Sequence, residues 1–254
     1  MITLEKILAC PKCKTLLKVK NEKLYCLRCK IPYAKEDGIW QLLYLKDSQG
    51  RKSQKEYDMA HKKYFGGPDD GSYEILSAMA RGNETVDIAC GEGQIEKLSP
   101  ETVAVEFSQN ALIKAKKNGA KYLVLADAHS LPFADNSFDV SISAGNIEHF
   151  QNPQKAINEM ARVSRIQVMT VHRHLPIPFG KFLFHLVTNI FNIKHQPLEK
   201  PISEGQLVKL VEKAGLHIVF KGVWTLPVNY GKVIPFLPVF EKIPSCYFVI
   251  SVKR

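Results

Sequence analysis

The sequence predicts an α/β protein built on a mostly parallel sheet, with a small cysteine-rich module ahead of it. Two observations support this prediction. From residue 54 onward, apolar runs typical of buried strands alternate with segments of helical periodicity. Before that point, four of the six cysteines stand in two C-x-x-C pairs. Alternating strands and helices favour parallel pairing, with helices on both faces of the sheet.

Length and composition fit one large domain plus a small module. The chain has 254 residues, of which 45% are hydrophobic and 24% are charged, and this is enough for a packed core. No apolar run is long enough to cross a membrane, and the first residues, MITLEKILACPKC, lack an export signal. We therefore expect a cytoplasmic protein without a membrane span.

Charge is spread unevenly along the chain. Residues 1–65 carry 15 Lys and Arg against 7 Asp and Glu, a balance of +8. Residues 66–170 carry 9 against 14, or −5, and residues 171–254 carry 11 against 4, or +7. Basic flanks suit a polyanionic partner such as RNA or an anionic membrane surface, although solubility alone would also account for them.

The paired cysteines predict a zinc site. CPKC is followed by twelve residues and then CLRC, and each pair can turn two thiolates toward one tetrahedral ion. Disulfides would suit an exported chain, and a redox motif would need only one pair. Alternation around Leu24 and Tyr25 predicts a hairpin that carries the second pair. The expected ligands are Cys10, Cys13, Cys26 and Cys29.

The pattern ACPKCK…LYC…C…PYA…DGIWQLL resembles two groups of zinc modules. One comprises the zinc-ribbon proteins that activate methyltransferases in translation. The other is the zinc domain that leads the ribosomal-RNA guanine-N1 methyltransferases. The likeness covers about residues 4–45. We therefore predict a zinc ribbon over residues 1–45, a polar linker over 46–53 and the main domain over 54–254.

Seven strands and their intervening helices are expected in the main domain. Ser108 and Asn152 stand at N-cap positions, Pro153 follows at the first helical position, and Ser203 with Gln206 forms a capping box. The expected strands are TVDIAC, TVAVEF, KYLVLA, FDVSISA, RIQVMTV, LHIVFKG and YFVISVK. The expected helices include SQKEYDMAHKKYF, SYEILSAMA, GQIEKL and SQNALIKAKKNG.

A ligand site is predicted where these strands end. The loop VDIACGEGQ follows the first strand, Glu106 ends the second strand 19 residues after Asp87, and Asp127 ends the third. An acid about 20 residues beyond a glycine turn can accept hydrogen bonds from both ribose hydroxyls. Such an acid suits a dinucleotide or an adenosyl ligand equally.

Charges in the loop separate these two ligands. A dinucleotide site uses G-x-G-x-x-G and holds a pyrophosphate on the turn. Here Glu92 lies inside the turn and Glu96 takes the place of the third glycine. Carboxylates in those places would repel phosphate, so the expected ligand is cationic and lacks phosphate. S-adenosylmethionine (SAM), with its sulfonium and ammonium groups, meets that description.

Four segments, in order, resemble class I SAM-dependent methyltransferases: DIACGEG, AVEFSQNAL, LADAHSLPFADNSFDVSIS and IEHFQNPQKAINEMARV. The likeness spans roughly residues 55–171, and it is greatest to the broad family that includes quinone-biosynthesis C-methyltransferases. It implies a Rossmann-like, mostly parallel seven-stranded sheet with helices on both faces, and SAM as the cofactor.

The resemblance also implies cofactor contacts. Glu106 would hold the ribose hydroxyls, and Phe107 would lie beside the adenine. Asp127 and the backbone N–H of Ala128 would bind the adenine edge. Ser143 and Ala144 would lie under the cofactor, and Tyr57 and Tyr64 would close over it. The methionine end would contact Asp87, Ala89, Cys90, Gly91 and Gly93, with Ala89 standing where the family has a glycine.

The methyl acceptor is less constrained. His149, His172 and His174 follow strand ends and are candidate general bases, although each also suits a surface or capping role. The ribbon and the basic flanks favour RNA or a translation component. An apolar stripe in the insertion at 175–200 favours an apolar small molecule such as a quinone or lipid, if the insertion is a substrate lid rather than a core or subunit contact. A third hypothesis is a non-catalytic zinc-ribbon adaptor with a vestigial cofactor fold.

Overall fold

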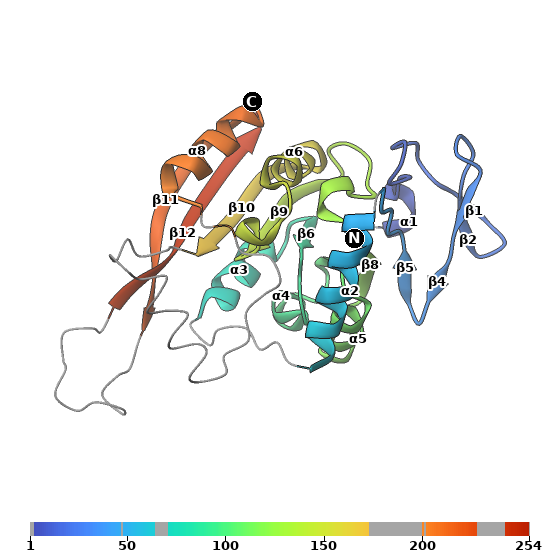
Figure 1. The fold of residues 1–254 in the computed structure, drawn as a ribbon, viewed down its shortest axis with the longest axis horizontal. Coiled ribbons are helices and arrows are strands. Elements are labelled where there is room, and N and C mark those ends of the chain that lie inside the picture. Colours follow the sequence, from blue (N-terminus) through green and yellow to red (C-terminus); the bar gives the residue numbers. More distant parts are fainter. Residues whose placement is uncertain are drawn as a thin grey trace.

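The computed structural model describes residues 3–46, 48–63, 71–172, 200, 202–227 and 242–253. Its main sheet has nine strands in the order β11-β12-β10-β9-β6-β7-β8-β5-β4, and a separate sheet has the order β1-β2-β3 (Figure 1). The strands of the main sheet are β4 (Lys35–Glu36), β5 (Ile39–Gln41), β6 (Thr85–Ile88), β7 (Val103–Glu106), β8 (Tyr122–Leu125), β9 (Phe138–Ala144), β10 (Ser164–His172), β11 (Leu216–Pro227) and β12 (Lys242–Lys253).

All seven strands predicted for the main domain are present, and the sheet is mostly parallel. Strands β10, β9, β6, β7, β8 and β5 pair in parallel, whereas β12 runs antiparallel between β10 and β11. Every residue of β6 and β7 is buried, Asp87 and Glu106 included, as expected for strands covered on both faces. The predicted Rossmann-like α/β fold is therefore confirmed.

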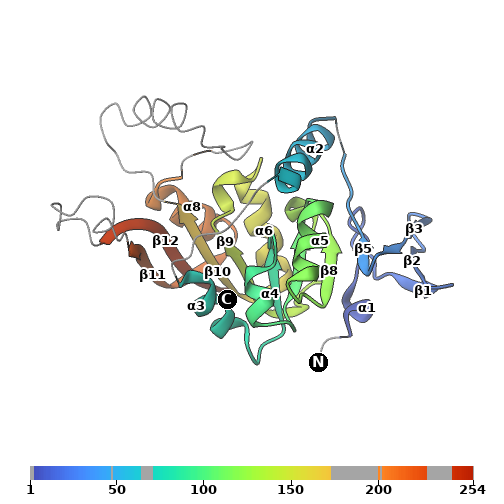
Figure 2. The same ribbon diagram turned by 90° about the horizontal axis from the view of Figure 1, so that it is seen from below.

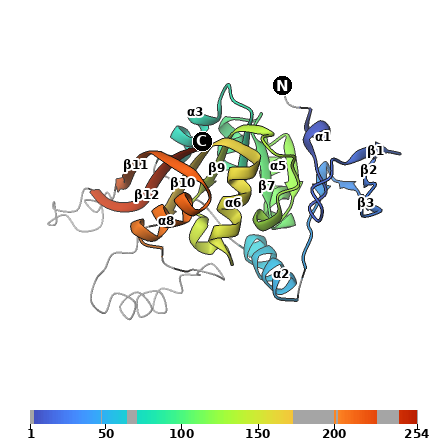
Figure 3. The ribbon, with the colours of Figure 1, turned by 90° about the horizontal axis from the view of Figure 1, so that it is seen from above.

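Helices cover both faces of the sheet. On one face, α3 and α4 pack on β9 and β10, while α5 packs on β7 and β8. On the other face, α6 and α8 share a core with β6 and β7 (Figure 3). The predicted caps of Ser108 and Asn152 and the capping box at Ser203 are all formed. The helices are α1 (Leu4–Ile7), α2 (Ser48–Lys63), α3 (Ser72–Ala80), α4 (Gln94–Leu98), α5 (Gln109–Lys117), α6 (Pro153–Val163) and α8 (Glu204–Lys213).

The N-terminal module, here called the ribbon, comprises residues 3–33. It contains α1, β1 (Lys18–Lys20), β2 (Lys23–Cys26) and β3 (Ile31–Tyr33), and the expected hairpin with the second cysteine pair is β2-β3. Figure 2 shows it beyond β8 at one end of the main sheet, with β11 and α8 at the other end. Its buried residues Leu8 and Leu24 belong to the same hydrophobic core as α6 and α8. The ribbon is therefore packed against the domain rather than tethered to it.

The predicted boundaries at 45 and 53 differ from the observed elements. Residues 35–41, assigned to the ribbon from sequence, form β4 and β5 and extend the main sheet by parallel pairing of β5 with β8. Ile39 and Trp40 are buried there, so the exposed edge of β8 is covered. Helix α2 begins at Ser48, inside the predicted linker 46–53, because its polar residues still form a continuous helix that packs against α5.

A polar network joins the ribbon to the loop that follows β8. The Lys14 ammonium donates to Ser130 Oγ at 3.1 Å and to the Leu131 carbonyl at 3.0 Å, and pairs with Glu159 at 2.8 Å. Ser130 in turn donates to the Pro11 carbonyl. The first cysteine pair therefore lies directly against residues 128–133.

No helix among the described residues is long and apolar enough to cross a membrane. Tyr64, His174 and residues 175–199 of the lid predicted at 175–200 lie outside the described residues.

Candidate active site

A cavity of about 350 Å³ lies at the carboxyl ends of β6, β7, β8 and β9. Parallel strands bring these ends to one edge of the sheet, and this edge is the usual ligand site of such folds. The walls come from the strand ends, from α2 and from the loops after β8 and β9. The residues that line the cavity include Ser53, Tyr57, Asp87, Ala89, Cys90, Gly91, Glu92, Glu106, Phe107, Asp127, Ala128, His129, Ala144, Gly145, Asn146, His149, Gln151 and His172.

The loop after β6 uses three left-handed residues in different ways. Ala89 has φ 61°, and its N–H donates to the Val105 carbonyl at 2.8 Å. Gly91 has φ +57° and lines the cavity; a Cβ placed there would meet nothing within 4 Å. Gly93 has φ +78°, and a Cβ there would lie 2.8 Å from Ala115 Cβ. Gly91 therefore leaves room for a ligand, whereas Gly93 allows the loop to pack on α5.

Glu106 is held rigidly at the end of β7. Its Oε2 accepts from the Gly91 N–H at 3.0 Å, and its Oε1 accepts from the N–H groups of Phe107 and Ser108 at 2.6 and 3.0 Å. Three backbone donors compensate its burial and fix its orientation toward the cavity. A carboxylate preset in this way is suited to accept hydrogen bonds from ligand hydroxyls.

A second carboxyl, that of Asp87, lies buried next to Glu106. Asp87 is 2% exposed, and its Oδ1 has no hydrogen-bond partner among the described residues. Burial, reinforced by the charge of Glu106, raises the pKa of Asp87 to about 8. A carboxylate that lines a cavity without a partner is costly unless a donor or cation reaches it. The ammonium group of SAM is such a cation, so this site fits the expected cofactor.

Glu96 does not contribute to the acidic rim that the sequence predicts for this loop. Glu96 is fully buried, neither of its side-chain oxygens has a partner among the described residues, and burial raises its pKa well above the usual range. Burial thus disfavours the charged form of Glu96, which lies beneath the loop instead of on its rim. Glu92 does line the cavity, but its carboxylate pairs with Lys114 at 2.7 Å. The carboxyl that favours a cation is Asp87.

Asp127 takes part in a local network that the sequence did not reveal. Its Oδ1 accepts from the His129 N–H at 2.9 Å and lies 2.6 Å from His129 Nδ1. Burial raises the pKa of Asp127, but the hydrogen bonds and charge of His129 outweigh burial and leave the pKa below its usual value. Asp127 is therefore ionised at neutral pH and directed along the cavity wall.

Helix α2 is fixed over the cavity at two points. Asp58 accepts from Ser108 Oγ at 2.8 Å and from the Asn110 N–H at 2.9 Å, at the start of α5. Nearer the start of α2, the Gln151 side-chain amide donates to Ser53 Oγ at 2.8 Å. Tyr57 is thereby held against Phe107 in an edge-to-face contact, with ring centroids 6.4 Å apart.

The far side of the cavity carries a histidine group. His149 ends the short 3-10 helix η2 (Ile147–His149), and His172 ends β10. The buried Glu148 accepts from the His172 N–H at 2.9 Å and also bonds its Nδ1. Burial raises the pKa of Glu148, but these bonds to His172 outweigh it and leave the pKa below the usual value. Glu148 therefore belongs to this histidine group, although it is not among the site residues predicted from the sequence.

Most predicted site residues meet in this cavity. Gly93 and Ser143 do not line it: Gly93 packs on α5, and Ser143 is fully buried within β9. Tyr64 and His174 cannot be placed, because they lie outside the described residues. The predicted residues that line it are Tyr57, Asp87, Ala89, Cys90, Gly91, Glu106, Phe107, Asp127, Ala128, Ala144, His149 and His172.

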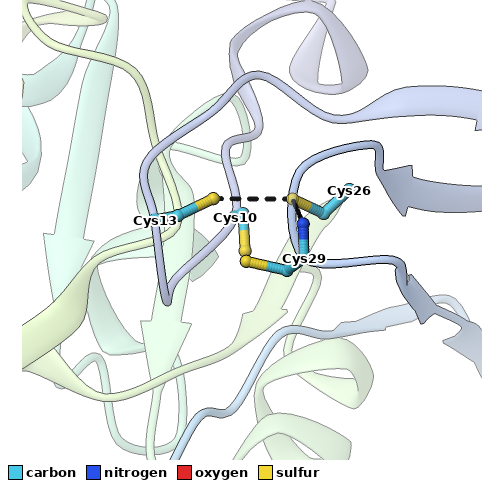
Figure 4. A group of neighbouring side chains, drawn as sticks. All are labelled: Cys10, Cys13, Cys26 and Cys29. Carbon is cyan, nitrogen blue, oxygen red and sulfur yellow. Dashed lines mark hydrogen bonds between the residues drawn. The ribbon is translucent and has the colours of Figure 1, made fainter.

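The four ribbon cysteines form a second cluster (Figure 4). All four sulfurs lie within 4.8 Å of one another, and Cys13 Sγ is 3.5 Å from Cys26 Sγ. Thiolates on one tetrahedral zinc, at about 2.3 Å each, lie roughly 3.8 Å apart. The Cys29 N–H and the Tyr33 hydroxyl contact cluster sulfurs, as hydrogen bonds around such sites do. The cluster is consistent with a zinc ribbon.

Comparison with known families matches residues 86–169 to the family described as Methyltransferase domain. The matched span runs from β6 to β10 and includes the glycine loop, Glu106 and Asp127. Residues 86–169 are therefore similar to a methyltransferase domain.

Named relatives of the methyltransferase domain differ in what they act on. Demethylmenaquinone methyltransferase of Desulfitobacterium hafniense is 32% identical over 49% of this chain and 56% of its own length. Malonyl-[acyl-carrier protein] O-methyltransferase of Buchnera aphidicola is 37% identical over 34% of this chain and 37% of its own. The human protein named Probable tRNA methyltransferase 9B is 36% identical over 35% of this chain and 21% of its own. The chain thus spans about a fifth to just over half of these relatives.

Solved structures share the fold at low identity. A SAM-dependent methyltransferase of Thermotoga maritima has a TM-score of 0.54 and 18% identity, covering 81% of this chain and 93% of its own. A chain from the complex of the Haloferax volcanii Trm112 methyltransferase activator with a candidate methyltransferase has a TM-score of 0.55 and 15% identity, covering 82% and 99%. These similarities establish the methyltransferase fold.

Packing at Gly93 can be tested by comparing Gly93→Ala with Gly82→Ala. Both glycines have φ +78°, but a Cβ at Gly82 meets nothing within 4 Å. Gly82→Ala should cost only the left-handed backbone penalty of about 1–2 kcal/mol. Gly93→Ala should lose a further 1–3 kcal/mol, roughly, through overlap with Ala115. Urea unfolding measures both values, and equal losses would show that Gly93 does not hold the loop against α5.

Proposed function

We propose that this protein transfers a methyl group from SAM. The observation that carries the proposal is Asp87, a buried carboxyl on the cavity wall whose Oδ1 lacks a partner among the described residues. The SAM ammonium would compensate it, and Gly91 would let the methionine backbone approach closely. Glu106 would accept from the ribose hydroxyls, Asp127 would face the adenine, and Tyr57 would close the cavity from α2.

Catalysis would depend chiefly on alignment. SAM supplies an electrophilic methyl group on a positively charged sulfur, and the protein must hold a nucleophile in line with it. The rigid Glu106 and the fixed α2 support such positioning. His149 and His172 lie on the wall of the same cavity, where an acceptor with a proton to lose would need a base.

Cofactor binding is tested by Glu106→Gln. The amide keeps the side-chain size but loses the charge, so hydrogen bonds from the ribose hydroxyls should weaken and SAM affinity should fall about 10- to 100-fold. Isothermal titration calorimetry measures this change. The control is Glu101→Gln, which alters an exposed glutamate and should leave affinity unchanged. Wild-type protein that binds no SAM would contradict the proposal and favour the non-catalytic adaptor.

We further propose that Cys10, Cys13, Cys26 and Cys29 hold one zinc ion that orders part of the cofactor site. Two contacts support this coupling: Ser130 donates to the Pro11 carbonyl, and Lys14 reaches Ser130 and Leu131. Pro11 lies inside the first cysteine pair, and Ser130 lies three residues after Asp127.

Zinc removal should therefore weaken cofactor binding as well as the ribbon. Cys26→Ser should lose the metal, lower the thermal midpoint and weaken SAM affinity several-fold, since ribbon folding depends on the ion. Cys246→Ser, on β12, should retain zinc and affinity. Metal analysis with calorimetry measures both. Wild-type protein without zinc would refute the site, and unchanged affinity in Cys26→Ser would refute the coupling.

RNA or a translation component is the acceptor we propose. The ribbon surface supports this choice: it exposes basic side chains interleaved with apolar ones, and such surfaces suit nucleic acid. The names of the human relative and of the Trm112 complex point the same way. The exposed ribbon residues are Lys12, Leu16, Lys18, Val19, Lys20, Lys23, Leu27, Arg28 and Lys30.

An apolar small molecule is the alternative acceptor, and the relative named demethylmenaquinone methyltransferase favours it. Incubation of the protein with radiolabelled SAM and cell extract separates the two. Label should enter the RNA or protein fraction, and RNA affinity should fall steeply with salt because phosphate contacts release counterions. Label confined to the organic-solvent fraction would overturn the RNA assignment in favour of a quinone or lipid.

A further inference from the structure

We propose that Glu148, His149 and His172 form a binding site for one divalent transition-metal ion on the acceptor side of the cavity. Glu148 and His149 come from η2, just after β9, and His172 comes from the end of β10. Parallel pairing of β9 with β10 sets Ala144 beside Thr170, and this register brings η2 next to His172. One ligand atom from each of the three residues lies within 4.8 Å of the others.

The buried side chain of Glu148 is the main support for this metal site. Its side chain is 0% exposed, and a buried carboxylate needs compensation on both oxygens. Its Oε1 bonds the N–H and Nδ1 of His172, whereas its Oε2 has no hydrogen-bond partner among the described residues. A cation at this oxygen would remove the cost of burying an unpaired oxygen.

Room for the His172 ring is built into the backbone. Gly145 follows β9 with φ +67°, and a Cβ there would lie 2.7 Å from His172 Cε1. The Gly145 N–H is fixed to the Thr170 carbonyl at 2.9 Å. Asn146 holds the neighbouring turn by donating to the carbonyls of Ala89 and Ala144, both at 3.0 Å. The ring therefore lies in a space that any larger residue at 145 would fill.

Two imidazoles and one carboxylate form a ligand set typical of zinc, iron, cobalt and manganese sites. Metal bonds of about 2.1 Å place tetrahedral ligands roughly 3.4 Å apart, so a bound ion would draw these three ligand atoms, now within 4.8 Å of one another, closer together. Since both histidines line the cavity, the remaining coordination positions would face it. Those positions suit water or an acceptor oxygen, which the ion would bind as a Lewis acid.

Cobalt titration of the full chain, with its ribbon saturated with zinc, tests this site without SAM or acceptor. We expect one Co²⁺ to bind beyond the zinc content, with visible d–d absorption and no thiolate charge-transfer band. Glu148→Gln and His172→Ala should each weaken cobalt binding at least tenfold. His217→Ala removes an exposed imidazole on β11 and should change nothing.

Circular dichroism establishes that each variant is folded, and His149→Ala replaces any variant that is not. No cobalt uptake at millimolar concentration, or uptake that all the variants retain, would overturn the proposal. Uptake with a thiolate band would assign the ion to cysteines and would also overturn it. Because the titration contains no SAM, its outcome is independent of the calorimetric test of the methyltransferase.

Discussion

One electrostatic constraint governs this molecule: three carboxyls converge at the ends of two adjacent parallel strands. Parallel pairing of β6 with β7 places Asp87 and Glu106 at one edge, and α4 adds Glu96 beneath them. Each carboxyl is compensated differently. Backbone N–H groups compensate Glu106, and burial raises the pKa of Glu96. Burial raises the pKa of Asp87 to about 8, and its Oδ1 has no hydrogen-bond partner among the described residues.

The same arrangement explains why the neighbouring charges are neutralised. Lys114 pairs with Glu92, and His129 bonds Asp127, so neither acid leaves a further unpaired charge on the wall. In the proposed mode of cofactor binding, a single carboxyl, that of Asp87, would set the preference for a cation. A cationic cofactor would be held there by charge, whereas hydrogen bonds at Glu106 would fix its position along the cavity.

The ribbon contributes to the architecture of the main domain in addition to carrying the cysteine cluster. It shares the hydrophobic core with α6, and its chain continues into β5, which covers the edge of β8. Arg162 of α6 bonds the carbonyls of Leu131 and Phe133, while Lys14 reaches the same loop from the ribbon. The loop after Asp127 is thus held from two sides. A change at the cysteine cluster would be transmitted to the cofactor site through these contacts.

Local sequence signals were sufficient for the elements and insufficient for burial. Ser108, Asn152 and Ser203 cap helices as predicted, because capping depends on neighbouring residues. The burial of Glu96 could not be predicted, because its position in the sequence does not indicate the direction of its side chain. Glu148 was overlooked for a similar reason: its partner His172 is 24 residues away. Strand β5 could not be assigned to the main sheet, because its pairing with β8 is long-range.

Ala89 illustrates how a departure from the expected glycine is accommodated. An alanine at φ 61° costs about 1–2 kcal/mol relative to ordinary backbone, so the turn must be stabilised from outside. Its N–H bonds the Val105 carbonyl of β7, and its own carbonyl accepts from the Asn146 amide. Asn146 belongs to the turn that brings Glu148 and His172 together. The donor loop and the acceptor wall are therefore joined by one amide, and the backbone strain at Ala89 is balanced by contacts that also fix the distance between the two halves of the site.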